Sequence, residues 1–428
     1  MRILAILGIT ILAITTLSGL SFVACDSNNE TPVSDVVDEP QQTEEQLITP
    51  EQEEELVITI GNLTDVTGPA SNAMSVIDMA LDDLVRYYNA NNIIPSVRLK
   101  VIQYDGQMDP SKSIPGYQWL KERGADLIYT AVPSVALTLE TPVNDEEMIM
   151  FAMAPAKAAI EPPGYVFCTG PLADHEVLTL LKWIAENDWD YQTDGPAKIG
   201  GASWDDPRSR AAIDAMEQYA EVHPDQFEFV GGYFTNFAFT WGPEVEALKD
   251  CDYLYPPGIM STFVKEYRDA GHTAKFIGAG AHFSFLNMID EAGLWDEIDG
   301  MLVAAPTSYW NEEDEMITLT KQLLNEYHPD EAEKIMRMGW TYISMSSLYT
   351  TLDIIARAAE STGPENFDSQ ALFEAASSYS LTVEGVPRYS YNETKRYPNN
   401  YYGIYEAQSA QEDLLRIDPE LRYHVTEP

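Results

Sequence analysis

The feature that most constrains the fold is the stretch of residues 56–90, which joins a strand pattern to a helix pattern through a short polar turn. The run Leu56 to Ile60 is apolar and rich in β-branched residues, which predicts a strand buried on both faces. We expect this strand to stop at Gly61, and the turn ends in Gly68-Pro69, two residues that interrupt regular structure. Such a turn lies at the carboxyl end of a strand, where open α/β sheets bind their ligands.

The helix predicted after this turn is amphipathic. Its apolar residues recur at spacings of three and four and form one stripe, made of Ile77, Ala80, Leu81, Leu84, Val85 and Tyr88. The charged residues Asp78, Asp82, Asp83 and Arg86 are expected to face away from that stripe. The stretch is therefore one β-turn-α unit.

Composition sets limits on size and partners. A chain of 428 residues with 45% hydrophobic content can bury a large core, and its length suggests two or three domains. The formal net charge of -44 repels nucleic acid and anionic lipid headgroups, so no nucleic-acid partner is expected. A solvated acidic surface explains this charge more simply than recognition of a cationic partner does.

The first residues predict export. Arg2, the apolar run Ile3 to Leu20 and the small residue Ala24 form a signal peptide over 1–24. Cys25 directly after it resembles the lipobox cysteine of bacterial lipoproteins, which is lipidated and anchors the protein to a membrane; the alternative is an incidental cysteine. Residues 26–55 contain no Lys or Arg and no sustained apolar period, so 25–55 is expected to be a disordered acidic tether behind the lipid anchor.

Strand and helix patterns alternate through the rest of the chain, which predicts an α/β fold with parallel sheets. The number of strand patterns fits two sheets of about five strands each, and hence a bilobal protein. Cys168 and Cys251 belong to different strand regions and are expected to remain separate thiols. The last third predicts a long helix over Trp340 to Glu360, and Tyr401 to Glu406 is expected to end the ordered body.

Several short motifs occur in the order found in one family. They are Gly68-Pro69, Tyr104-Asp105 with Asp109-Pro110, Tyr165-Val166-Phe167 with Thr169 and Pro171, Gly300-Met301-Leu302-Val303, Trp340-Thr341-Tyr342 and Gly385-Val386-Pro387. Over residues 56 to about 406 the chain thereby resembles the type I solute-binding proteins of ABC importers, most closely the leucine/isoleucine/valine-binding branch.

The resemblance implies two Rossmann-like lobes joined by a three-segment hinge near Ala173, Pro306 and Val383. The lobes implied are an N-terminal lobe of 56–173 plus 307–383 and a C-terminal lobe of 174–306 plus 384–428. It also implies an extracytoplasmic monomer that binds a small-molecule solute in the cleft between the lobes and docks on an ABC permease in the membrane.

In the N-terminal lobe, the resemblance places candidate ligand contacts on the turns after the strands. Ser134 stands where the family binds a ligand carboxylate, although a plain helix N-cap is an equal alternative. Ala156 replaces the usual Thr or Ser hydroxyl. Lys157 is a candidate for neutralising an anionic ligand, and its alternative is a solvated surface charge. Asn72, beyond the first turn, is the last candidate of this lobe.

In the C-terminal lobe, Gly280 stands near the place where amino-acid binders carry an acidic residue that pairs with the ligand's ammonium group. Without that partner a buried ammonium group is uncompensated, so a simple α-amino acid is a poor ligand. His282 is a candidate hydrogen-bond donor, with a structural histidine as the alternative.

Three further candidates follow strands of the same lobe. They are Trp204, Arg208 and Tyr255, with core or rim packing as the alternative for each.

The motifs of covalent catalysis, phosphate binding and metal binding do not occur in the sequence. We therefore expect no enzyme activity, no metal and no cofactor. The predicted function is capture of a small polar or amphipathic solute, such as a carboxylate, an amide or an amino-acid-like molecule, for an ABC importer. The alternative is a ligand-sensing receptor of the same fold that partners a membrane signalling protein.

Overall fold

The computed structural model describes residues 55–236 and 238–428. The predicted signal peptide, Cys25 and the tether up to residue 54 lie outside these described residues. Within the described ranges, no helix combines the length and the apolar character needed to cross a bilayer.

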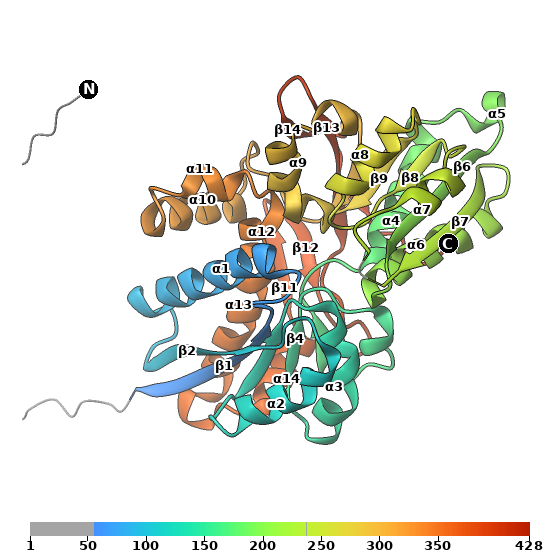
Figure 1. Cartoon of the computed structure of the whole chain (residues 1–428). Coiled ribbons are helices and arrows are strands. Elements are labelled where there is room, and N and C mark those ends of the chain that lie inside the picture. Colours follow the sequence, from blue (N-terminus) through green and yellow to red (C-terminus); the bar gives the residue numbers. More distant parts are fainter. Residues whose placement is uncertain (1–54, 237) are drawn as a thin grey trace, which may run out of the picture. The chain divides into compact units, whose positions relative to one another are not determined.

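The first sheet is entirely parallel. It contains β1 (Leu56–Thr64), β2 (Val97–Asp105), β3 (Leu127–Thr130), β4 (Met150–Ala152) and β5 (Val166–Cys168), in the order β2-β1-β3-β4-β5. The inner strand β1 pairs Ile60 with Val101 of β2 on one side and with Leu127 of β3 on the other. This sheet with α1 (Ser71–Ala90), α2 (Ser113–Lys121) and α3 (Pro133–Asp145) is called the first lobe below (Figure 1).

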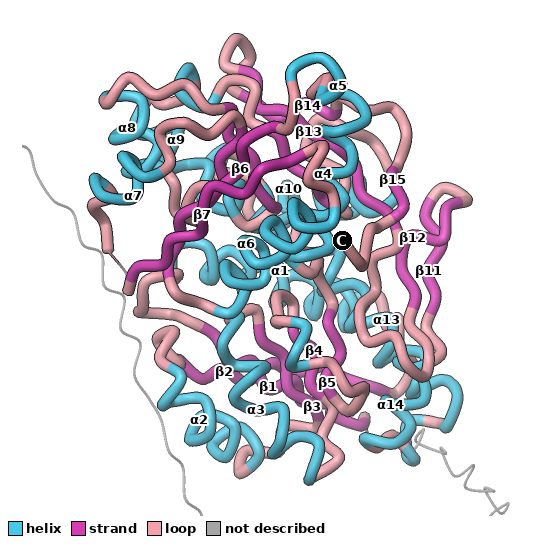
Figure 2. The backbone as a smooth tube through the Cα atoms, turned by 90° about the vertical axis from the view of Figure 1, so that its right-hand side faces the viewer, coloured by secondary structure: helices cyan, strands magenta, loops and turns pink. Residues whose placement is uncertain are grey.

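The second sheet is mixed. Its parallel part runs β10-β9-β8-β6-β7, with bounds β6 (Ala197–Trp204), β7 (Phe227–Thr235), β8 (Tyr253–Tyr255), β9 (Lys275–Ala279) and β10 (Leu302–Ala305). The strands β13 (Tyr401–Gln408), β14 (Asp413–Arg416) and β15 (Arg422–Tyr423) add antiparallel pairs at the β10 side. Figure 2 shows the two sheets as separate groups of strands.

Helices and turns accompany the second sheet, which together with them is called the second lobe. They are α4 (Ala173–Asn187), α5 (Tyr191–Asp194), α6 (Pro207–Val222), α7 (Gly242–Ala247), α8 (Ser261–Asp269) and α9 (Leu286–Ala292), with the 3-10 turns η3 (His282–Phe285) and η4 (Asp296–Ile298). The 3-10 turns η1 (Pro110–Lys112) and η2 (Lys157–Ala159) belong to the first lobe.

The chain between β10 and β13 is mainly helical. Its elements are α10 (Glu315–Tyr327), α11 (Ala332–Met336), α12 (Trp340–Ile343), α13 (Met345–Thr362), η5 (Pro364–Asn366) and α14 (Ser369–Ser377), followed by the hairpin β11 (Ser380–Val383) and β12 (Val386–Ser390). Both α12 and α13 contact α1, so this segment packs on the first lobe although it follows the second-lobe strand β10. The exact lobe boundaries stay a prediction.

The prediction of an α/β fold with two lobes is confirmed, but four details were wrong. The strand β1 continues through Gly61, where a Cβ would lie 2.9 Å from the Cβ of Ala125, so this glycine permits close packing and does not end the strand. The predicted long helix is divided at Ser344 into α12 and α13. The ordered body does not end at Glu406, because β14 and β15 follow.

The fourth correction concerns Asp83, which is buried and does not face away from the apolar stripe of α1. Its Oδ2 accepts a hydrogen bond from the hydroxyl of Tyr342 at 2.7 Å and lies 2.8 Å from Nε2 of His328. The Asp83 side chain therefore connects α1 to the helical segment between β10 and β13. The prediction of separate thiols is confirmed, since Cys168 and Cys251 are both free and buried.

Candidate functional site

A cavity of about 200 Å³ lies at the carboxyl ends of the parallel strands of both sheets. The first lobe contributes the segments after β1, β2, β3 and β4, and the second lobe contributes those after β6, β8, β9 and β10. The segment around α12 and α13 completes the wall with Trp340, Ser344 and Ser347. This is the position where open α/β sheets bind ligands.

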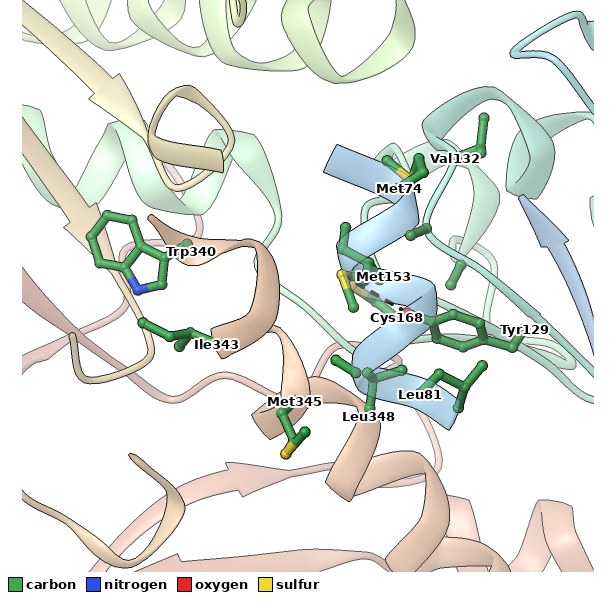
Figure 3. Close-up of a cluster of buried hydrophobic side chains, with 14 of the residues drawn as sticks. Met74, Leu81, Tyr129, Val132, Met153, Cys168, Trp340, Ile343, Met345 and Leu348 are labelled. Carbon is green, nitrogen blue, oxygen red and sulfur yellow. Dashed lines mark hydrogen bonds between the residues drawn. The ribbon is translucent and has the colours of Figure 1, made fainter. Parts of the chain in front are cut away.

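The wall from the first lobe is apolar at every described residue. Its members are Ala70, Ala73, Met74, Ile77, Met108, Ala131, Val132, Pro133, Met153 and Ala154. Figure 3 shows Met74, Val132 and Met153 near α1, with Trp340 on α12 opposite them. This wall offers contact area to an apolar ligand, and its methionines adapt to irregular shapes.

The turn between β1 and α1 shapes this wall. The buried carboxylate of Asp65 accepts hydrogen bonds from the backbone N–H groups of Gly68 and Ala70, the latter at 2.8 Å. A Cβ on Gly68 would lie 2.4 Å from Oδ1 of Asp65, so the turn closes this tightly only around glycine. The first turn of α1 is thereby held with Ala70 and Ala73 against the cavity.

The wall from the second lobe carries the polar groups. Asp206 is the N-cap of α6, and its side chain accepts from the backbone N–H groups of Arg208 at 3.0 Å and Ser209 at 3.1 Å. Pro207 follows at the first helical position, where its fixed φ is favourable. This cap places Arg208 in the first turn of α6, where it lines the cavity.

Arg208 and Glu176 form a buried ion pair between Nη2 and Oε2. Nη1 of Arg208 also donates to the carbonyl of Pro171 at 2.9 Å, and Oε1 of Glu176 accepts from the N–H of Gly280 at 2.9 Å. Burial raises the pKa of Glu176 to about 6, against the opposing effect of the Arg208 charge. Both residues line the cavity, so its one described cation already has a counter-ion.

Aromatic rings close two parts of the cavity. Nε1 of Trp204 donates to the carbonyl of Ala238 at 2.9 Å, and the Trp204 ring packs edge-on against Phe239 at 5.5 Å between centroids. The ring of Trp340 packs edge-on against Tyr309 at 5.1 Å and Tyr405 at 5.3 Å. These contacts hold both indoles in defined positions, as a wall for an apolar ligand requires.

Of the residues predicted from the sequence, the structure brings Trp204, Arg208 and Gly280 to the cavity. Tyr255 and His282 lie buried behind its wall, with their rings 4.6 Å apart. Nδ1 of His282 accepts from the N–H of Ala279 at 3.0 Å, and Nε2 contacts the carbonyl of Pro256 at 2.9 Å. Burial lowers the pKa of His282 to about 4.

The four candidates from the first lobe do not line the cavity. Ser134 is the second residue of α3, whose N-cap is Val132, so its hydroxyl is neither a cap nor part of the lining. Ala154 lines the cavity in place of Ala156.

Lys157 is a half-buried residue outside the lining, with Glu161 at 3.8 Å and Glu427 at 3.9 Å. Asn72 lies outside it as well, and its Nδ2 makes a long 3.5 Å hydrogen bond to Asn287 of α9, which joins the two lobes.

Glu176, whose carboxylate accepts the hydrogen bond from the N–H of Gly280, was not predicted from the sequence. A signal for it exists, because α4 is apolar on nearly all sides and a carboxylate in such a helix must find a partner. The partner itself, from another helix, is not readable from the sequence. Within the described residues, no group of three His, Cys, Asp or Glu side chains is placed to hold a metal ion.

Two lobes with a cavity at the strand ends of both define a receptor that encloses a small molecule. A family model described as periplasmic binding protein matches residues 57–412. The chain belongs to this family, which confirms the resemblance noted from its motifs. Among curated proteins, none matches the sequence significantly.

Solved structures share the fold at low sequence identity. A branched-chain amino acid ABC transporter protein from Thermus thermophilus with bound valine has a TM-score of 0.74 and 16% identity, covering 87% of this chain and 97% of that one. A fatty acid ABC transporter substrate-binding protein from Thermomonospora curvata has a TM-score of 0.72 and 13% identity, covering 86% of this chain and 92% of that one. A solute-binding protein from R. palustris in complex with 4-hydroxybenzoate has a TM-score of 0.70 and 17% identity, covering 86% of this chain and 97% of that one.

Proposed function

We propose that this chain is the solute-binding component of an ABC importer, which captures a small amphipathic solute in the cavity between its lobes and delivers it unaltered to a permease. The observation that carries this proposal is the cavity itself, lined from the strand ends of both sheets. A ligand that contacts both lobes favours their closed arrangement, which a permease can distinguish from the empty one.

The chemistry of the walls supports an amphipathic solute. The first-lobe wall is apolar, and the polar groups gather on the second lobe and around Ser344. The named ligands of the structural neighbours, valine and 4-hydroxybenzoate, combine an apolar part with a polar head. An extracytoplasmic location, a lipid anchor at Cys25 and a monomeric state complete the proposal.

A thermal-shift screen of the full-length chain tests this function. The panel contains amino acids, aromatic acids, amides and short peptides, each at a concentration well above the micromolar range. A ligand at about 100 times its Kd stabilises the folded state by about 2.7 kcal/mol, which raises Tm by a few degrees. Selective stabilisation by one class, with the solute recovered unchanged, supports the proposal. Absence of stabilisation across the panel, or chemical conversion of the solute, contradicts it.

A further inference from the structure

The charged groups at the cavity compensate one another. Among the described residues of the lining, the ionisable ones are Glu176, Asp206 and Arg208. The carboxylate of Asp206 caps the amino terminus of α6 and also accepts from the hydroxyl of Ser209 at 2.6 Å. The helix terminus carries a partial positive charge, which balances this carboxylate. Glu176 and Arg208 balance each other as an ion pair.

A charged ligand would therefore find no free counter-ion in this lining. A carboxylate beside Arg208 would meet the negative charge of Glu176, which already neutralises the guanidinium and whose two oxygens accept hydrogen bonds from Arg208 and Gly280. An ammonium group would meet carboxylates whose oxygens are occupied by backbone and side-chain donors. A buried charge without a partner is energetically unfavourable, so either ionic head is strongly disfavoured.

Three polar atoms of the lining residues are left without a partner among the described residues. They are Nε of Arg208 and Nε1 of Trp340, which are donors, and the hydroxyl oxygen of Ser344, which both donates and accepts. All three atoms are buried, and an unpaired buried polar group destabilises the folded protein. A ligand head whose oxygen accepts up to two hydrogen bonds and whose N–H donates another matches these three atoms.

The size of the cavity limits the rest of the ligand. An apolar cavity of about 150 Å³ in another protein accommodates benzene. The present cavity of about 200 Å³ accommodates a body of one ring, or a short branched chain, with a small head group.

We propose that the solute is an uncharged molecule with an apolar, ring-sized body and a head of the carboxamide type, which accepts a hydrogen bond from Arg208 and exchanges one with Ser344. This inference rests on the proposed function and narrows its substrate class. It separates this chain from relatives whose named ligands carry a carboxylate.

Three molecules with one ring and different heads test the inference directly: benzamide, benzoate and benzylamine, titrated calorimetrically into the full-length chain at pH 7.5. We expect benzamide to bind at least tenfold more tightly than either ion. Equal or tighter binding of benzoate or benzylamine overturns the inference, and so does the absence of binding by all three. The proposed function is judged separately, because it fails when the whole solute panel fails to bind or when the solute is chemically converted, and neither outcome depends on the ranking of these three molecules.

The variant Glu176→Gln removes the negative charge of the ion pair between Glu176 and Arg208 and nearly keeps the size of the side chain. Without the Glu176 charge, Arg208 becomes a free counter-ion, so the affinity for benzoate relative to benzamide should rise at least tenfold. The matched control is Glu186→Gln on the same helix, where the glutamate is half-exposed and 3.9 Å from Arg422. An unchanged ratio in a folded Glu176→Gln variant, verified by near-ultraviolet circular dichroism, overturns the inference. The wild-type comparison decides alone if that variant does not fold.

Discussion

Gly339, the residue before α12, faces the carbonyl oxygen of Phe283 in η3, and a Cβ on Gly339 would lie 1.9 Å from that oxygen. Its φ of 71° and ψ of -123° belong to a region that residues with a side chain rarely adopt. The contact brings the helical segment that packs on the first lobe against a turn of the second lobe. Close approach at this point therefore depends on the absence of a side chain.

We predict that Gly339→Ala lowers the free energy of unfolding by about 2–6 kcal/mol, since backbone strain and the steric clash each contribute about 1–3 kcal/mol. The control is Gly385→Ala, where φ is also positive at 80° but no atom lies within 4 Å of the added Cβ. That change should cost about 1–2 kcal/mol. Urea unfolding of both variants measures the difference, and equal losses would show that the clash is relieved by movement.

The buried ion pair predicts an asymmetry between single and double substitutions. Arg208→Met leaves the carboxylate of Glu176 buried without its cation, which should destabilise the protein by about 3–5 kcal/mol. Adding Glu176→Leu to the same chain removes the uncompensated charge and should restore most of the lost stability. Guanidinium unfolding of the single and double variants checks it. A double variant no more stable than the single one would contradict the explanation.

Stability should fall with acid through His282. Its pKa is lowered by burial from 6.5 to about 4 in the folded protein, so the unfolded chain binds the proton more readily. The stabilisation is fully present above pH 6.5 and is lost as the pH falls from 6.5 toward 4, by about 1.4 kcal/mol per pH unit.

The variant His282→Gln removes this titration. Between pH 7.5 and pH 5.0 the wild-type protein should lose about 2 kcal/mol more unfolding free energy than the variant does. The same substitution at the partly exposed His223 is the control for replacing a histidine elsewhere in the chain. Urea titrations at the two pH values give the comparison. If wild type and His282→Gln lose the same unfolding free energy between the two pH values, His282 is not the cause of the pH dependence.

A large side chain introduced at the cavity tests whether the solute binds at Ala154, which lines the cavity in the structure, or at Ala156, which the sequence predicted. Ala154 lines the cavity and Ala156 does not, although both are half-buried and only two residues apart. Ala154→Trp should weaken binding of the solute found in the thermal-shift screen more than tenfold, because the indole occupies its space. Ala156→Trp should leave the affinity within about twofold of wild type, since it changes no lining residue. Calorimetric titration decides, and the reverse pattern would move the site to the position expected from the sequence.

The local sequence determined most of the architecture. Alternating strand and helix patterns predicted the first sheet and the parallel part of the second, because each pattern follows from which face of an element is buried. The antiparallel strands that make the second sheet mixed were not predicted. The motifs identified the family that the comparison confirms. Boundaries were less accurate, as Gly61 shows, because a glycine that ends a strand and one that admits a close neighbour look alike in sequence.

The cavity was only partly predictable. Trp204, Arg208 and Gly280, which the family resemblance placed on turns after strands, line the cavity, because the carboxyl ends of parallel strands meet at one edge. Glu176 was not found, since its meeting with Arg208 and Gly280 joins three segments that only the folded chain brings together. Short-range patterns in the sequence predicted which elements form and at which edge of the sheets the cavity lies. The tertiary structure alone decided which charges are already paired there, because pairing depends on distances between residues far apart in the chain.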